Sequence, residues 1–275
     1  MWGFGGIFAA LTFASGLVVA FYRLWLGATL LAILTYVLGK RLTWATLRAT
    51  WLAGIFLAGD MTMFYSAVRL TSIVDVTVIG AFQPALVLLA ARRLFNERMS
   101  RRDVAWILVA MVGVGVAVLG PGVASHHQVV GDLLSVGALL SFTGYWLVTK
   151  HARELHDAME YTAGVTLMAA AAVTPIVLLS SQSLGRVKFG DWTWIVLLAL
   201  VPGSGHLVMN WAHRFVDASV SSAISCLAPL VAAVAAIPIL GQSLTLVQVG
   251  GVLLGLAAIA VVAARHRQPA QTQLE

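Results

Sequence analysis

Long runs of apolar residues, separated by short clusters of charged and turn-forming residues, follow one another along the whole chain. Most of these runs approach the roughly 20 residues that an α-helix needs to cross the hydrocarbon core of a bilayer. Runs such as 106–119 do not alternate between apolar and polar positions, which argues against the strands of a membrane β-barrel. The pattern predicts ten membrane-spanning helices, at residues 2–14, 17–38, 50–69, 73–91, 103–120, 132–149, 159–180, 192–213, 218–240 and 245–264.

The composition points to the same class of protein. Apolar residues make up 60% of the 275 residues and only 10% are charged, whereas a soluble domain carries about 25% charged residues. A soluble enzyme or a nucleic-acid-binding protein needs more polar surface than this, so we expect no nucleic-acid partner. The loops between the predicted helices are too short to hold a soluble domain, so the function must lie among the helices.

Basic residues are distributed unequally over the predicted loops. With the N-terminus placed in the cytoplasm, 13 of the 17 Lys and Arg residues lie in cytoplasmic loops or in the tail, and three lie in outer loops. Cytoplasmic loops of membrane proteins carry such an excess of positive charge. We therefore predict a multi-pass protein of the inner cell membrane with both termini cytoplasmic. The remaining basic residue, Arg23, lies inside the second span, where it either snorkels outward, pairs within the bundle or attracts an anionic substrate.

The two halves of the chain share a pattern at an offset of 145 residues. Under this offset, Gly59–Leu119 overlies Ser204–Ala264 without a gap, and Pro84 meets Pro229. Each half then holds five spans, and an odd number of spans inverts the second half in the membrane. The predicted fold is an all-α membrane protein with ten transmembrane helices arranged as two inverted five-helix repeats. Many secondary transporters have this architecture, with the substrate site near the midplane where the repeats meet.

Four short motifs occur in order along the first half. They are Trp2-Gly3, Phe21-Tyr22-Arg23-Leu24, Phe64-Tyr65-Ser66-Ala67, and Pro84 followed by Glu97-Arg98-Met99-Ser100. Together they resemble the motifs of EamA-type transporters in the drug/metabolite transporter superfamily. The second half repeats the last motif with Pro229, but Gln242 replaces the glutamate. The first helix, 2–14, departs from the family pattern because it is either short or truncated at its front, so Met1 need not be the natural start.

The resemblance implies two EamA-like repeats, at 1–120 and 132–264, followed by a cytoplasmic tail at 265–275. It also implies export or facilitated transport of small metabolites. The chain contains no Gly-rich phosphate loop, no convincing catalytic or metal motif and no sign of a cofactor, so we expect a secondary transporter and not an enzyme.

We predict outward movement of small polar metabolites such as amino acids, with proton coupling left open. The alternatives are a passive facilitator, a drug exporter, or a non-transporting protein such as an intramembrane enzyme or a lipid scramblase. The expected partners are the substrate and the lipid bilayer. A homodimer is also open, because Gly251 and Gly255 predict either helix packing or a dimer face.

Ionisable residues inside the spans are the first candidates for the site, because a charge in hydrocarbon is costly and turns toward the bundle interior. Asp60 is the one carboxylate well inside a span, and it either bonds a neighbouring helix or binds a proton or a substrate amine. One face of the eighth span carries His206, Asn210, His213 and Asp217. We predict a water-filled path along this face, with hydrogen bonding between helices as the alternative.

The predicted cavity lies between the third, fourth, sixth, eighth and ninth spans. Its candidate wall residues are Asp60, Tyr65, Gln83, Ser141, Tyr145, Trp146, His206, Asn210 and Ser225. For the three residues of the sixth span, the alternative is an interface between helices, with Trp146 facing lipid.

Asp60 and His206 are the candidates for proton coupling. The predicted hinges are Pro84, Pro229 and Gly203, because proline and the cluster around Gly203 weaken a helix. Glu97 lies in a basic turn, where we expect it to pair with neighbouring arginines.

Overall fold

The computed structural model describes the chain except for residues 72, 98, 119–128, 154–155, 241–244 and 266–275. All regular structure in the described residues is helical, which confirms the predicted all-α class. The helices are α1 (Gly3–Leu11), α2 (Gly16–Val37), α3 (Trp44–Leu70), α4 (Ile73–Gly80), α5 (Gln83–Leu94), α6 (Arg101–Val118), α7 (Val129–Ala152), α8 (Ala158–Leu179), η1 (Leu184–Arg186), α9 (Phe189–Ala212), α10 (Ala218–Ser225), α11 (Leu227–Leu240) and α12 (Leu246–Arg265).

Eight segments in the described part of the chain are long and apolar enough to cross a membrane. They are α2, α3, α4 with α5, α7, α8, α9, α10 with α11, and α12. The chain is therefore a multi-pass membrane protein. Of the two remaining predicted spans, α1 has nine residues and is about 14 Å long, roughly half of a hydrocarbon core. The other, α6, has 18 residues and begins with the charged sequence Arg101–Asp103.

Two of the predicted spans are each divided into two helices. The span at 73–91 consists of α4 and α5, which are separated by Ala81 and Phe82. The span at 218–240 consists of α10 and α11, which are separated by Cys226. Both α4 and α10 have eight residues, and their bounds differ by 145 positions. The structure thus corrects the prediction of single helices in these two places.

Prolines account for both breaks. A proline has no backbone N–H to donate, and its ring clashes with the carbonyl group four residues earlier. Four residues before Pro84 is Gly80, the last residue of α4. Four residues before Pro229 is Ser225, the last residue of α10. Each helix therefore ends at the residue whose carbonyl group loses its intrahelical partner.

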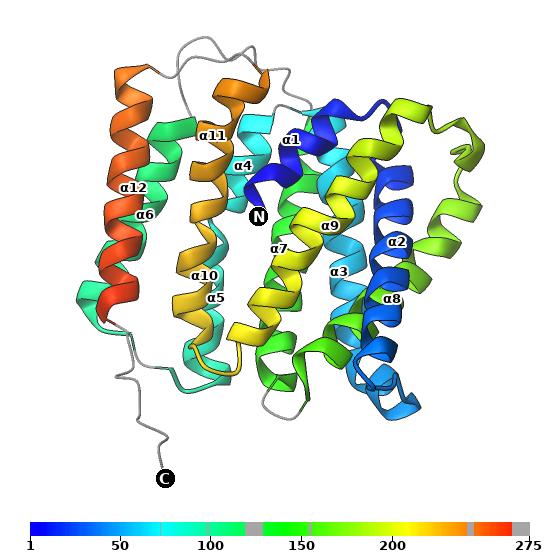
Figure 1. The fold of residues 1–275 in the computed structure, drawn as a ribbon. Coiled ribbons are helices and arrows are strands. Elements are labelled where there is room, and N and C mark those ends of the chain that lie inside the picture. The colour runs from blue at the N-terminus through cyan, green and yellow to red at the C-terminus, as the bar shows by residue number, and fades with distance from the viewer. Residues whose placement is uncertain (72, 98, 119–128, 154–155, 241–244, 266–275) are drawn as a thin grey trace.

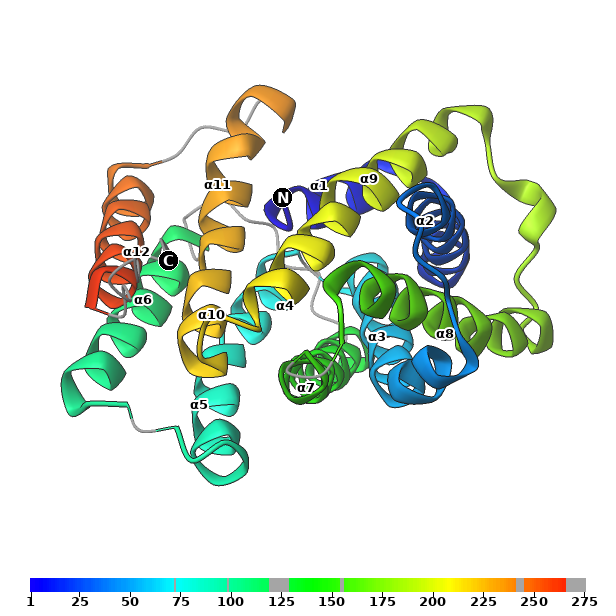
Figure 2. The ribbon, with the colours of Figure 1, turned by 60° about the horizontal axis from the view of Figure 1, so that its bottom comes forward.

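The helices pack in two groups that lie side by side (Figure 1 and Figure 2). One hydrophobic core is shared by α1, α2, α3, α7, α8 and α9. Smaller cores are shared by α6, α10, α11 and α12. Between the groups, α4 packs against α6 and α7, and α5 packs against α7 and α10. The first residues of α1 lie at mid-height of the bundle (Figure 1), where α1 contacts α9 and α11.

Helices α6 and α12 pack closely, and their backbones meet through glycines. A Cβ atom added at Gly113 would lie 2.6 Å from the backbone nitrogen of Gly255. A Cβ atom added at Gly251 would lie 2.5 Å from the backbone nitrogen of Ala117. No larger residue fits at these distances without a shift of the backbone. Gly251 and Gly255 therefore serve helix packing inside the chain.

We call the end of the bundle at which α2, α5 and α9 end, and α10 begins, the lower end, as it is drawn in Figure 1. An ion pair ties two loops together there. Asp157 precedes α8 and accepts a hydrogen bond from the backbone N–H of Met159 at 2.9 Å, which caps the helix. The ammonium group of Lys40 lies 2.6 Å from the same carboxylate. This contact fixes the start of α8 to the segment between α2 and α3.

Candidate functional site

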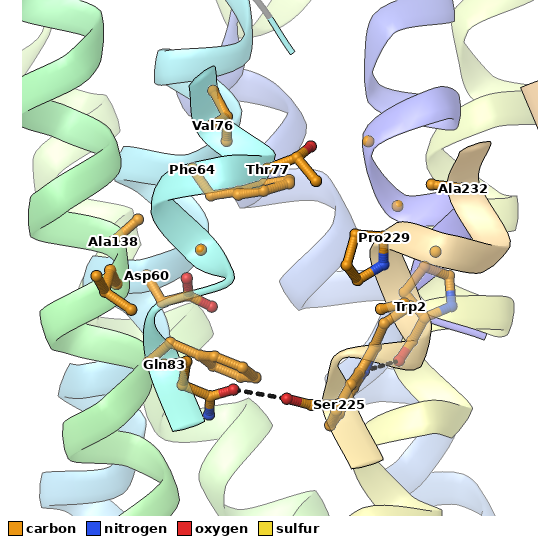
Figure 3. A pocket seen from close by; sticks show the side chains of 18 of the residues that line it. Trp2, Asp60, Phe64, Val76, Thr77, Gln83, Ala138, Ser225, Pro229 and Ala232 are labelled. Carbon is orange, nitrogen blue, oxygen red and sulfur yellow. Dashed lines mark hydrogen bonds between the residues drawn. The ribbon is translucent and has the colours of Figure 1, made fainter. Parts of the chain in front are cut away.

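A cavity of about 220 Å³ lies between the two helix groups. The two broken helices supply facing walls: Val76 and Thr77 of α4 lie across the cavity from Pro229 and Ala232 of α11 (Figure 3). Most of the lining is apolar, with a few polar side chains. This is the usual character of a site for a small molecule.

Asp60 of α3 points into the cavity (Figure 3). Its side chain is 6% exposed. Within the described residues its carboxyl group makes no hydrogen bond and no ion pair at contact distance, although the charge of Arg23 is close enough to affect it. A buried carboxyl group without a protein partner can bind a proton or a cationic group of a ligand. The sequence left two interpretations of Asp60 open. The described residues of the structure do not show the first of these, a bond from Asp60 to a neighbouring helix.

Gln83 and Ser225 join the two helix breaks across the cavity floor (Figure 3). The hydroxyl group of Ser225 lies 2.8 Å from Oε1 of Gln83, to which it donates. The amide nitrogen of Gln83 is buried and has no partner among the described residues. An amide N–H that is already desolvated but unpaired is available to a ligand carbonyl or carboxylate group.

Arg23 of α2 also lines the cavity, although the second span was not among the predicted walls. The side chain is buried and does not snorkel to the surface. Its Nε donates a hydrogen bond to the carbonyl oxygen of Leu198 at 3.2 Å, and its guanidinium carbon lies 5.8 Å from the centre of the Tyr65 ring. Leu198 is four residues before Pro202, so this arginine satisfies the carbonyl group that the proline leaves without a donor.

Helix α9 continues through Pro202 and Gly203, where the sequence predicted a hinge. Gly203, one of the three predicted hinges, lies within a continuous helix and outside the main cavity. The other two, Pro84 and Pro229, line the cavity beside the breaks that they cause.

His206 lies on the cavity wall among aromatic rings. Its ring centre is 5.1 Å from that of Trp2, 5.6 Å from that of Tyr145 and 6.3 Å from that of Phe142. Trp2 is itself held by a hydrogen bond of 3.1 Å from its Nε1 to the carbonyl oxygen of Pro202. The Nδ1 atom of His206 is buried and has no partner in the described part of the chain.

The other polar residues of the eighth span do not line the cavity. Asn210 accepts a hydrogen bond from the Tyr145 hydroxyl at 2.8 Å and donates one to the Thr162 hydroxyl at 2.9 Å, which links α9 to α7 and α8. His213 is fully buried, with its ring 4.8 Å from that of Trp146, and Asp217 lies beyond the end of α9. Below His206 the structure thus agrees with hydrogen bonding between helices and not with a water-filled path.

The three candidate residues of the sixth span, α7, lie at interfaces between helices, which was the alternative to a cavity wall. Ser141, Tyr145 and Trp146 do not line the cavity. Ser141 faces Gly59 of α3, and Trp146 is fully buried, with its Nε1 donating to the carbonyl oxygen of Ala218 at 3.3 Å, so it does not face lipid either. The cavity face of α7 consists of Ser135, Ala138, Leu139 and Phe142. These four residues recur at the spacing of one helix face, which could have identified the cavity wall. The prediction instead followed the polar residues on the neighbouring face.

The short helix α1 is another wall that the sequence analysis missed. Trp2, Gly3, Gly5, Gly6 and Ile7 all line the cavity. Its glycines allow this approach: a Cβ atom added at Gly3 would lie 2.5 Å from the carbonyl oxygen of Ala228 in α11. The Trp-Gly pair at the start of the chain was therefore the available signal. Of the nine predicted wall residues, the structure places Asp60, Tyr65, Gln83, His206 and Ser225 on the cavity.

A second cavity, of about 190 Å³, lies between α2, α3, α8 and α9. It is lined mainly by leucines, including Leu30, Leu34 and Leu200. Arg23 and His206 line both cavities, so these two side chains stand between them. Neither cavity offers a metal site: no cluster of three His, Cys, Asp or Glu side chains occurs in the residues that the structure describes.

Comparison with known proteins agrees with this architecture. A solved structure titled only "Crystal structure of protein" superposes with a TM-score of 0.80 at 18% sequence identity, over 97% of this chain and 95% of that chain. At this identity the match concerns the fold alone. No curated protein sequence matches the chain significantly. The model of the EamA-like transporter family matches residues 1–119 and 129–264. The chain therefore belongs to the EamA-like transporter family, within the drug/metabolite transporter superfamily.

Proposed function

We propose that this protein is a secondary transporter of the inner cell membrane that exports small polar metabolites such as amino acids. The observation that carries the proposal is the cavity between the two helix groups, which is lined by Asp60, Gln83, Arg23 and an apolar wall. Binding sites of secondary transporters lie near the midplane beside interrupted helices. Here both interrupted helices line the cavity.

We further propose that the fold consists of two inverted five-helix repeats. The constant offset of 145 residues between α4 and α10 supports this. The packing supports it as well. When each helix is replaced by its counterpart in the other half, several packed helix pairs become other packed pairs. The contact of α3 with α7 corresponds to that of α9 with α1, and the contact of α3 with α8 corresponds to that of α9 with α2. The pair α6 with α12 corresponds to itself, whereas the counterpart of α5 with α10 is α11 with α4, the pair on either side of the cavity.

The charge distribution supports a cytoplasmic lower end, since the loops there carry the excess of Lys and Arg. With this orientation, α5 and α10 meet on the cytoplasmic side, whereas the cavity separates α4 from α11 on the outer side. The protein is then outward-facing. Alternating access would bring α4 toward α11 and part α5 from α10, with the breaks at Ala81–Phe82 and Cys226 as hinges.

The chemistry of the wall suits a zwitterion with an apolar portion. The Asp60 carboxyl group can receive a substrate ammonium group, and the unpaired Gln83 amide and the Arg23 charge can receive a carboxylate group. The rings of Trp2 and Phe142 offer a surface for the apolar part. Asp60 and His206 line the same cavity, which supports them as the groups that exchange a coupling proton.

Transport by purified protein in proteoliposomes tests the proposal. We expect radiolabelled amino acids to leave loaded vesicles faster than they leave protein-free vesicles, and a pH gradient to drive accumulation. Transport without a response to the gradient would favour a passive facilitator, and efflux of cationic dyes alone would favour a drug exporter. Conversion of the solute, or flipping of a fluorescent lipid without solute movement, would contradict a transporter and favour an enzyme or a scramblase.

A further inference from the structure

The carboxylate of Glu97 holds the first turn of α10. Its Oε1 accepts a hydrogen bond from the backbone N–H of Ala218 at 2.8 Å. Its Oε2 accepts two more, from the backbone N–H of Ser219 at 3.1 Å and from the Ser219 hydroxyl at 2.7 Å. Both amide groups belong to the start of the helix, where N–H groups have no intrahelical acceptor and where the helix dipole favours a negative charge. These bonds are therefore charge-assisted.

A nearer cap for α10 is present but is not used. Asp217 occupies the N-cap position of α10, and its side chain makes no capping hydrogen bond. Glu97 comes from the turn after α5, more than one hundred residues earlier in the chain. That turn contains Asn96 with a φ of 54°, a left-handed conformation that asparagine tolerates better than most residues. The capping bonds thus tie the end of α5 to the beginning of α10.

An apolar cluster lies directly behind this contact. Val87 and Ala91 of α5, Trp146 of α7 and Ala218 are all buried and pack together. The Trp146 indole also donates a hydrogen bond to the carbonyl oxygen of Ala218. The cluster and the Glu97 bonds together close the lower end of the bundle below the Gln83–Ser225 contact. The cavity lies on the other side of that contact.

We propose that Glu97 is the lock of the cytoplasmic gate, on the basis of the transport function and orientation proposed above. The gate opens only when the end of α5 separates from the start of α10, and this separation breaks all three bonds to Glu97 and exposes the cluster around Ala91. The lock stabilises the outward-facing state relative to the inward-facing one. Removing the charge of Glu97 shifts the population toward the inward-facing state. The sequence predicted that Glu97 pairs with arginines of its own turn. Such a pairing does not involve α10, so it neither explains the bonds to α10 nor predicts this shift in population.

Cysteine accessibility measures this shift directly. Cys226 is the only cysteine, so Cys226→Ser gives a background without thiols. Ala232→Cys places a reporter on the cavity wall of α11, and Ala91→Cys places one in the closed cluster. In the unaltered gate we expect a membrane-impermeant methanethiosulfonate reagent to label Ala232→Cys quickly from the outer side. Ala91→Cys should react slowly from either side.

Adding Glu97→Gln should raise the labelling rate of Ala91→Cys from the cytoplasmic side by about tenfold and lower that of Ala232→Cys, since a charge-assisted bond is worth at least that factor. Ser219→Ala removes a single bond and should shift both rates in the same direction by less. Glu160→Gln is the matched control: it neutralises a carboxylate in the first turn of α8 at the same end of the bundle, and should change neither rate.

Unchanged labelling of both reporters in Glu97→Gln, with the protein folded by size-exclusion chromatography, would overturn the lock. An equal effect of Glu160→Gln would also overturn the lock, because it would show that Glu97 acts only through the general charge of this surface.

Failure of the proposed function is a separate result. Labelling of the two reporters from sides opposite to those expected would reverse the membrane orientation, and absence of solute transport would contradict the transporter, yet the ratio of the two rates would still report on the lock.

Discussion

The hydroxyl group of Ser225 lies 2.8 Å from Oε1 of Gln83, and this hydrogen bond joins the last residue of α10 to the first residue of α5. Both residues stand at a helix break, so the bond holds the two interrupted helices together at the level where each changes direction. The cavity lies on one side of this bond, and the closed apolar cluster around Ala91 lies on the other. A movement of α4 or α11 on the cavity side, or of α5 or α10 on the closed side, must therefore be accommodated at the two helix breaks.

Ser225→Ala should lower the stability of the folded protein by about 1 kcal/mol, the typical size of a hydrogen bond between membrane helices. The Gln83 carbonyl oxygen would then be buried without a donor. Thermal unfolding in detergent, followed by tryptophan fluorescence, measures the effect. Ser222→Ala is the control, because the Ser222 hydroxyl bonds only to its own helix at the carbonyl oxygen of Ser219. Equal losses in both variants would show that the link between the helices adds nothing.

Asp60→Asn should abolish transport driven by a pH gradient yet keep solute exchange at equal concentrations on the two sides. Asparagine has nearly the shape of the carboxyl group but cannot exchange a proton at neutral pH. The measurement is counterflow against gradient-driven accumulation in the same vesicles. Full gradient-driven transport would remove Asp60 from coupling. Loss of both activities would assign it to substrate binding or to structure.

Only the first residue of the polar face of α9 should be accessible to water. In the Cys226→Ser background, His206→Cys should react with a small water-soluble thiol reagent. Asn210→Cys and His213→Cys should not react, because both residues are fully buried. Val208→Cys, on the exposed face of α9, is the control for a position in contact with lipid. Labelling of all three polar positions would restore the water-filled path that the sequence predicted.

The membrane orientation makes a separate prediction. A reporter fused after Gly39, in the turn that follows α2, should lie in the cytoplasm, and one fused after Gln182, between α8 and α9, should lie outside. Five predicted spans separate the two positions, and an odd number places them on opposite sides. Alkaline phosphatase and green fluorescent protein fusions report the two compartments. The same compartment for both positions would contradict the ten-span topology.

Asp157 should give the stability a dependence on acid pH. Burial by itself raises the pKa of this carboxyl group, but the bonds from Lys40 and from the backbone of Met159 and Glu160 outweigh it and lower the pKa below its usual 3.8. A group whose pKa is lower in the folded state stabilises the fold above its unfolded pKa, and this stabilisation is lost as the pH falls through the folded pKa. Asp157→Asn should therefore lower Tm at pH 7 and change it less as the pH approaches 3. A constant difference in Tm between pH 7 and pH 3 would contradict this.

The sequence predicted the helices well because run length and polarity are local properties, and eight of the ten segments have the length and composition of a span. It predicted the cavity less well because the rotation of each helix depends on its neighbours. Helix α7 carries aromatic and hydroxyl side chains on two adjacent faces, and packing against α3 decides which of them turns inward. Prolines were equally ambiguous. Pro84 ends a helix, whereas Pro202 does not, since Arg23, from another helix, bonds the carbonyl group that Pro202 leaves unpaired.

The glycine contact between α6 and α12 has a consequence for spectroscopy. At Gly113 and Gly255 the backbones touch without intervening side chains, so the pair has no layer that can repack and should move as one rigid body. Spin labels at Leu108 and Leu253, both exposed on this pair, would define a fixed reference frame. Distances from that frame to a label on α4 or α11, measured by electron–electron double resonance, would then record the displacement of each cavity wall separately as substrate is added.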